Sequence, residues 1–242
     1  FRDNSINSQV LKLFLEQHYI PAPFGILENT YQVLPGEIVS FSLMGKIKNL
    51  RYWEFQKQIS PSIYDKNNAI ELISNSLENS VKMQLISDVP VGAFLSSGVD
   101  SSLICSFLSK YKKQQAFSTF TIGSDSKKFD ESYEAKIFAD IIGVRNENYL
   151  MNGSNVLLVL EDIMKSITEP FADISILPTY ITSKLAKSEV KVSLSGDGGD
   201  ELFFGYERFW SIAKNINVES FPYFIKYMLY GLDKVLSKNE KI

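Results

Sequence analysis

The chain has 242 residues, of which 45% are hydrophobic, 13% aromatic and 22% charged, as in an ordinary globular protein. Its 28 acidic and 25 basic side chains give a net charge of -3, which argues against a nucleic-acid binder that depends on a strong basic field. One cysteine, Cys105, and one histidine, His18, exclude a disulfide within the chain and a cysteine-rich or multi-histidine metal site. No apolar run approaches the ~18 residues of a membrane span, and no signal peptide is visible. We therefore expect a cytoplasmic protein with no membrane or nucleic-acid partner.

The first 60 residues predict small elements joined by linkers. Residues 8–19 have the apolar spacing of a short helix, and prolines and glycines interrupt residues 20–36. Residues 39–43 and 47–53 predict the two strands of a β-hairpin. Residues 56–64 indicate a further linker, so we expect a domain boundary near residue 60.

From Asp65 onward, helical segments alternate with apolar segments. Asp65 and Ser154 are suited to begin helices as N-caps, and Gly143 to end one as a C-cap. The alternation predicts an α/β fold with a doubly wound parallel sheet and helices on both faces, preceded by the hairpin. The expected helices cover 66–86, 101–111, 131–142, 154–167 and 176–188, and the expected strands 89–95, 117–122, 148–151 and 190–194.

One expected strand runs into a loop of small residues and then directly into a helix. The loop is Ser96-Ser97-Gly98-Val99-Asp100-Ser101, which is neither a Walker A motif nor a dinucleotide-binding motif. Small side chains let backbone N–H groups approach an anion, and the helix adds its positive N-terminal end. Asp100 would repel phosphate, so its presence makes sense if it holds Mg²⁺ that binds the phosphates. The alternative is an ordinary turn in which Asp100 or Ser101 is the N-cap.

A second loop, rich in glycine, follows the expected strand 190–194. It reads Ser195-Gly196-Asp197-Gly198-Gly199-Asp200-Glu201, with three glycines and three acids. Ligands of open α/β sheets bind at the carboxyl ends of the strands, so we expect both loops to face one crevice. The clustered carboxylates need a metal or a cationic partner. A solvated acidic turn is the alternative.

Three other groups of reactive residue types have simpler interpretations. Cys105 lies on the expected helix 101–111 beside apolar neighbours, which favours plain packing. His18 is expected on the surface of the first helix. Asp130 and Glu131 are expected to cap the helix that follows them.

Both loops resemble known sequences. The first is similar to the Ser-Gly-Gly-x-Asp-Ser pyrophosphate loop of the N-type ATP pyrophosphatases and departs from it at Ser97, where glycine is usual. The second closely resembles the Ser-Gly-(Glu/Asp)-Gly-(Ser/Gly)-Asp-Glu segment of the glutamine-hydrolysing asparagine synthetase family, followed here by Gly205 and Tyr206. Further matches to that family lie at 19–23, 34–36, 120–123, 129–132, 169–173 and 177–180, so the resemblance covers residues 19–210.

The resemblance implies an adenine nucleotide alpha-hydrolase-like fold that binds ATP and Mg²⁺. Asp100 and Asp200 would hold the metal, and Asp197 and Tyr206 would act in the adenylate and substrate pocket. The residues implied to contact ATP are Leu95, Ser96, Ser97, Gly98, Asp100, Ser101, Ile122, Gly123, Ser195 and Gly196.

The activity that the resemblance implies is amide formation. The family activates the side-chain carboxylate of aspartate as an acyl-adenylate, with release of pyrophosphate, and ammonia from glutamine then gives asparagine and AMP. One alternative is an amidotransferase or cyclase acting on a sugar acid or a peptide, because Ser97 and residues 145–148 depart from the family pattern. A non-catalytic nucleotide-binding module is a second alternative. A homodimer is a further expectation.

The resemblance also implies a domain organisation. Residues 1–60 would be the end of a glutaminase domain and its linker, and residues 61–242 the N-terminal part of an ATP-binding synthetase domain. The family's first-residue cysteine nucleophile and its downstream catalytic lysine have no counterpart among these residues. We therefore expect the chain alone to bind ATP but to be a poor catalyst.

Overall fold

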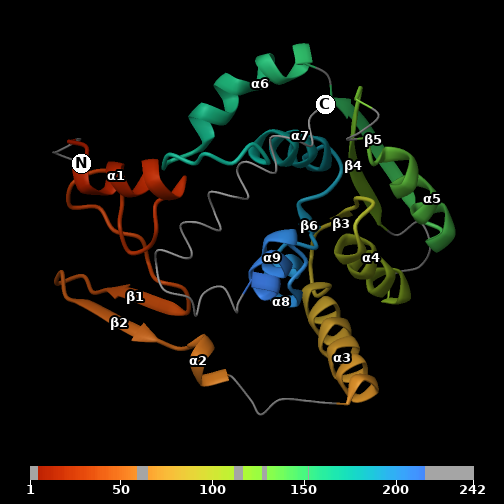
Figure 1. Ribbon diagram of the computed structural model, residues 1–242, viewed down its shortest axis with the longest axis horizontal. Helices are drawn as coiled ribbons and strands as arrows, with labels where there is room; N and C mark the ends of the chain where they lie inside the picture. Colours follow the sequence, from red (N-terminus) through yellow and green to blue (C-terminus); the bar gives the residue numbers. More distant parts are fainter. Residues whose placement is uncertain (1–4, 59–64, 112–116, 127–129, 152, 216–242) are drawn as a thin grey trace. The chain divides into compact units, whose positions relative to one another are not determined.

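The computed structural model describes residues 5–58, 65–111, 117–126, 130–151 and 153–215 (Figure 1). The chain divides into two compact units, Phe1–Ser195 and Gly196–Ile242, each described by itself. No helix among the described residues is both long and apolar enough to cross a membrane.

The N-terminal elements are a capped helix and a hairpin. Helix α1 (Ser8–Gln17) begins at Asn7, whose side chain accepts the N–H groups of residues 9 and 10. It ends at His18, which adopts a left-handed conformation (φ 68°), so this exposed histidine is a C-cap and not the expected helical residue. The hairpin is confirmed: β1 (Glu37–Phe41) pairs antiparallel with β2 (Ile47–Arg51), and a short helix α2 (Phe55–Gln58) follows.

The helices of the α/β part form where the sequence predicts them, within a few residues. Asp65 caps α3 by accepting the N–H of Asn68 at 2.7 Å, and Gly143 ends α5 with φ 72°. The expected cap at Ser154 is wrong, because α6 begins one residue earlier and includes it. The helices of the first unit are α3 (Lys66–Gln84), α4 (Val99–Tyr111), α5 (Ser132–Ile142), α6 (Gly153–Ser166) and α7 (Ile176–Lys187).

Four parallel strands form the sheet in the order β5-β4-β3-β6. They are β3 (Val91–Phe94), β4 (Ser118–Ser124), β5 (Arg145–Met151) and β6 (Val192–Leu194). Strand β5 begins three residues before the expected start. Its polar first half lacks apolar periodicity, but it pairs with β4 through the backbone from Ser118↔Arg145 onward, and such polar residues suit an edge strand.

Both faces of the sheet are covered by helices, which confirms the doubly wound fold. Val91, Ala93 and Leu95 belong to one buried cluster with residues of α3, α4 and α5. Phe94 and Phe120 belong to a second cluster that contains α7 residues. Figure 1 shows α5 and α7 on opposite sides of β4 and β5. The alternation of side chains along β3 therefore separates the two cores.

Strand order places a switch point beside β3. The chain proceeds outward from β3 to β4 and β5, and then returns to the other side of β3 as β6. In register, Phe94 pairs with Phe120 and Ala93 with Leu194, so the loops after β3 and β6 leave from the same edge. In doubly wound sheets this is where ligands bind.

Candidate functional site: a phosphate-type loop at the switch point

In the loop after β3, residues 96–101, serine hydroxyls form hydrogen bonds across the loop. The Ser96 N–H donates to Ser101 Oγ at 3.1 Å, the two hydroxyls lie 2.9 Å apart, and the Gly98 N–H donates to Ser96 Oγ at 3.1 Å. These hydroxyls thus shape the loop across the first turn of α4. The 13-residue helix starts at Val99, so its first-turn N–H groups and its positive end point toward this edge of the sheet.

The neighbouring strand ends supply the rest of this edge. Leu95 is buried, and its N–H donates to Phe120 O at 3.0 Å, which extends the ladder past β3. Ile122 and Gly123 lie in the last three residues of β4. A Cβ at Gly123 would lie 3.0 Å from Asp130 Oδ1 and 3.1 Å from Ser132 Cβ, so glycine lets the following turn pack against the strand.

That turn contains an acidic contact that sequence reasoning missed. The carboxylate of Glu131 accepts the N–H of Ser97 at 3.1 Å and makes no capping hydrogen bond to α5. Glu131 occupies the N-cap position of α5 but gives no side-chain cap, whereas Asp130, one residue earlier, accepts the N–H of Ser132, the first residue of the helix. Phe129 lies outside the described residues. No sequence pattern links positions 34 residues apart, although the acidic pair ahead of α5 was visible.

The second unit begins inside the second, glycine-rich loop, just after Ser195 ends the first unit. Of the three glycines, only Gly198 has a positive φ (90°), directly before α8 (Gly199–Phe203). Asp200 and Glu201 occupy the first turn of that helix, where carboxylates are favoured. Asp197 lies in the loop ahead of it.

Tyr206 belongs to a cluster within the second unit. Its hydroxyl donates to Glu201 Oε1 at 2.6 Å, and the guanidinium of Arg208 lies 4.2 Å from its ring centroid. The hydrogen bond lowers the pKa of Glu201 and raises the pKa of Tyr206. Arg208 belongs to α9 (Glu207–Asn215). Sequence reasoning singled out Tyr206 and counted Glu201 among the clustered carboxylates, but it missed the hydrogen bond between them and gave no role to Arg208.

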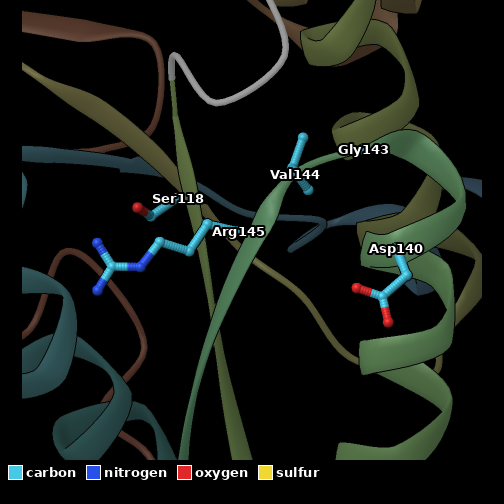
Figure 2. Close-up of a pocket in the computed structure, with 5 residues that line it drawn as sticks. All are labelled: Ser118, Asp140, Gly143, Val144 and Arg145. Carbon is cyan, nitrogen blue, oxygen red and sulfur yellow. The ribbon is translucent and has the colours of Figure 1, made fainter.

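A hollow of about 430 Å³ at the opposite edge of the sheet does not join these residues. Ser118 and Arg145, which line it, are the first residues of β4 and β5. Figure 2 shows these two side chains on one side of β5 and Asp140 on the other. Arg145 is ion-paired with Glu147 and Glu189. Its charge is therefore already matched, and the hollow lies at the wrong end of the strands for a ligand of this fold.

Metal ligands are few in the part of the chain that the structure describes. No group of three or more histidine, cysteine, aspartate or glutamate side chains gathers there. Mg²⁺ is commonly bound through one or two carboxylates together with phosphate oxygens, so such a cluster is not needed. The two carboxylates expected to hold Mg²⁺ lie in the first turns of two helices, Asp100 in α4 and Asp200 in α8.

Comparison with known families decides the family. Residues 72–234 match the family described as asparagine synthase, and this range is more than half of the chain. The chain belongs to the asparagine synthase family.

Two relatives illustrate the family match. The chain is 35% identical over 206 residues to a provisionally named glutamine-hydrolysing asparagine synthetase of Methanocaldococcus jannaschii, which covers 85% of this chain and 39% of the relative. It is 29% identical over 234 residues to glutamine-hydrolysing asparagine synthetase 1 of Bacillus subtilis, which covers 97% of this chain and 36% of the relative. The chain thus spans well under half of the length of these two relatives.

A solved structure gives a weaker likeness. The NH3-dependent NAD synthetase of Campylobacter jejuni aligns with a TM-score of 0.38 and 15% identity, over 73% of this chain and 86% of the other. A likeness of this degree says nothing about substrate. The family assignment therefore rests on sequence, and the doubly wound sheet on the topology described above.

Proposed function

We propose that the chain is the nucleotide-binding part of an ATP-dependent amide-forming ligase. The observation that carries the proposal is the closed Ser96–Ser101 loop at the switch point, whose Ser97 N–H already holds a carboxylate anion. A loop that presents backbone donors at a helix N-terminus suits a phosphate group. The family name favours aspartate as the acceptor, and the names of the two relatives favour glutamine as the source of ammonia.

The proposal gives the site residues four roles. Ser96, Ser97, Gly98 and Ser101 would surround the pyrophosphate, because they form the hydrogen-bonded loop that leads into the first turn of α4. Leu95, Ile122, Gly123 and Gly196 would contact the adenosine. Ser195, Asp197 and Tyr206 would line the adenylate and substrate pocket, and Asp100 and Asp200 would hold Mg²⁺. When bound, Mg²⁺ would stabilise the charge that develops on the leaving pyrophosphate.

The proposed reaction has two steps. A carboxylate oxygen attacks the α-phosphorus, and the bond to the β-phosphate oxygen breaks with loss of pyrophosphate. Ammonia then attacks the activated carbonyl carbon, loses a proton, and AMP leaves with the carbon–oxygen bonding pair. The contribution of this chain is proximity of carboxylate and α-phosphate and fixed N–H dipoles toward the leaving group.

The test is pyrophosphate release by the full-length gene product with ATP, Mg²⁺ and ammonium, with and without L-aspartate. We expect aspartate-dependent release together with asparagine. Asp200→Ala should abolish binding of ATP with Mg²⁺, whereas Asp88→Ala should not, because exposed Asp88 precedes β3 at the opposite edge of the sheet. An unchanged affinity in Asp200→Ala would contradict the assignment of Asp200 as a Mg²⁺ ligand.

Other carboxylates belong in the same assay. ATP binding without aspartate-dependent release would retain the nucleotide site and reject aspartate as the acceptor. Release with a sugar acid or a peptide would then identify an amidotransferase or cyclase. Binding without release for any acceptor would favour a non-catalytic nucleotide-binding module.

A further inference from the structure

The turn between β4 and α5 is fixed to the end of its strand. Asp130 Oδ1 accepts the N–H of Ser132 at 3.1 Å and the N–H of Ser124, the last residue of β4, at 3.3 Å. Hydrogen bonds from the hydroxyl and N–H of Ser132 keep the pKa of Asp130 below its usual value. Gly123 allows the close approach. The residue after Asp130 therefore starts from a defined position.

From that position, the side chain of Glu131 extends to the Ser96–Ser101 loop. It is the residue that precedes α5, yet its side chain makes no hydrogen bond to the N–H groups of its own helix. Its Oε2 instead accepts the Ser97 N–H, across 34 residues of sequence. A carboxylate here satisfies a donor that would otherwise face solvent beside the positive end of α4.

The same donor is one that the proposed function gives to a phosphate oxygen. One N–H cannot make two strong hydrogen bonds, and a carboxylate close to a phosphate repels it. Glu131 is exposed, so rotation of its side chain toward water meets no packed core.

We propose that Glu131 is a built-in competitor for phosphate: it occupies the Ser97 N–H when the loop is empty and withdraws when a pyrophosphate group binds. The inference rests on the proposed nucleotide site and adds a regulation of its affinity. It makes Glu131 a positioning residue for the empty loop, with no direct part in the reaction.

The experiment measures dissociation constants for inorganic pyrophosphate and for ATP, each with Mg²⁺, by titration calorimetry at low and high salt. Glu131→Gln keeps an acceptor but removes the charge, and Glu131→Ala removes both. At low salt we expect Glu131→Gln to bind both ligands about fivefold more tightly. This factor corresponds to the repulsion in water between two unit charges ~4 Å apart. The gain should shrink at high salt because exposed charges are screened.

The matched control is Glu134→Gln. Glu134 is an exposed glutamate in the first turn of the same helix and has the same charge. Its substitution should change affinity much less, because the hydrogen bond to Ser97 is made by Glu131 and not by Glu134. An equal gain in both variants would mean a general charge effect and would overturn the inference.

The remaining outcomes are also decisive. Weaker or unchanged binding in Glu131→Gln would overturn the inference, since the carboxylate would then support the ligand or ignore it. If neither the parent protein nor any variant binds pyrophosphate or ATP, the inference and the nucleotide site fail together. If pyrophosphate binds with the expected gain but no amide forms with any carboxylate, the proposed function fails and the competition stands.

Discussion

Ser97 stands where similar pyrophosphate loops have glycine, and its backbone does not require one. The described non-glycine residues with positive φ are His18, Asn29 and Phe204, so Ser97 is unstrained in this respect. Its contact with Glu131 uses the N–H group, which every residue except proline has. The departure from the family pattern therefore leaves the donor of the loop intact.

Ser97→Gly tests this interpretation. We expect the free energy of unfolding to fall by about 0.4–1 kcal/mol, because glycine adds conformational entropy to the unfolded chain without relieving strain. Urea unfolding followed by circular dichroism measures the change. An increase in stability would show that the serine is strained in the folded loop.

Cys105 is a residue of the core and not of the site. Its side chain is fully buried in the cluster between β3 and α4, and burial raises its pKa to about 12 from 9.0. The thiol therefore stays neutral at physiological pH, which suits packing and disfavours nucleophilic chemistry.

The raised pKa of Cys105 predicts a pH dependence of stability. Below pH ~9 the thiol is protonated in both the folded and the unfolded states, and its contribution is constant. As pH rises from ~9 toward ~12, only the unfolded state loses the proton, so the free energy of unfolding falls by up to about 1.4 kcal/mol per pH unit from this group. Comparing urea unfolding of the parent protein and Cys105→Ala over this range isolates the effect. Parallel curves would contradict it.

At the scale of elements, Asp200 lies in the short helix α8, and the turn after this helix packs against it. Phe204 ends the helix with φ 58°, and the Gly205 N–H donates to Asp200 O at 3.0 Å. The chain folds back so closely that a Cβ at Gly205 would overlap the Asp200 carboxylate. Glycine at this position therefore permits the observed orientation of the proposed metal ligand.

Gly205→Ala should displace the Asp200 carboxylate. If Asp200 binds Mg²⁺, affinity for ATP with Mg²⁺ should fall about tenfold or more, as for other changes that reorient a metal ligand. Calorimetric titration measures this. The control is Gly45→Ala in the β1–β2 turn, where a Cβ meets nothing within 4 Å and the strain of alanine at φ 75° falls on residues outside the site. Equal affinities in the two variants would argue against Asp200 as a ligand.

At the scale of the whole first unit, the two faces of the sheet must pack at the same time. Gly92, in the middle of β3, lies under the ring of Phe120 on the α7 face, while Val91 and Ala93 pack on the other. A Cβ at Gly92 would be 2.7 Å from Phe120 Cε2 and 2.9 Å from Ser118 O. Backbone cannot move aside easily, so the position requires glycine for space.

Gly92→Ala should therefore destabilise the fold by overpacking. We expect the free energy of unfolding to fall by about 1–3 kcal/mol, measured by urea unfolding. A neutral result would mean that Phe120 can shift without loss of packing on the α7 face.

The sequence by itself determined the features that depend on neighbouring residues, such as the ends of helices and the type of each segment. Asp65 caps α3 and Gly143 ends α5 because each acts on backbone groups within a few residues. The alternation of helical and apolar segments was enough for the doubly wound sheet, since each segment carries its own periodicity. The two loops of small residues and the family resemblance were visible in the sequence for the same reason.

Tertiary structure alone decided the rest. Three features join segments that are distant in sequence. They are the pairing of β6 with β3, the pairing with β4 that makes β5 start earlier than expected, and the hydrogen bond between Glu131 and Ser97. Their geometry depends on sheet pairing and on packing over two faces, which no local pattern encodes. The sequence therefore singled out a candidate phosphate loop, and only the folded chain revealed that the Glu131 carboxylate accepts one of its N–H groups.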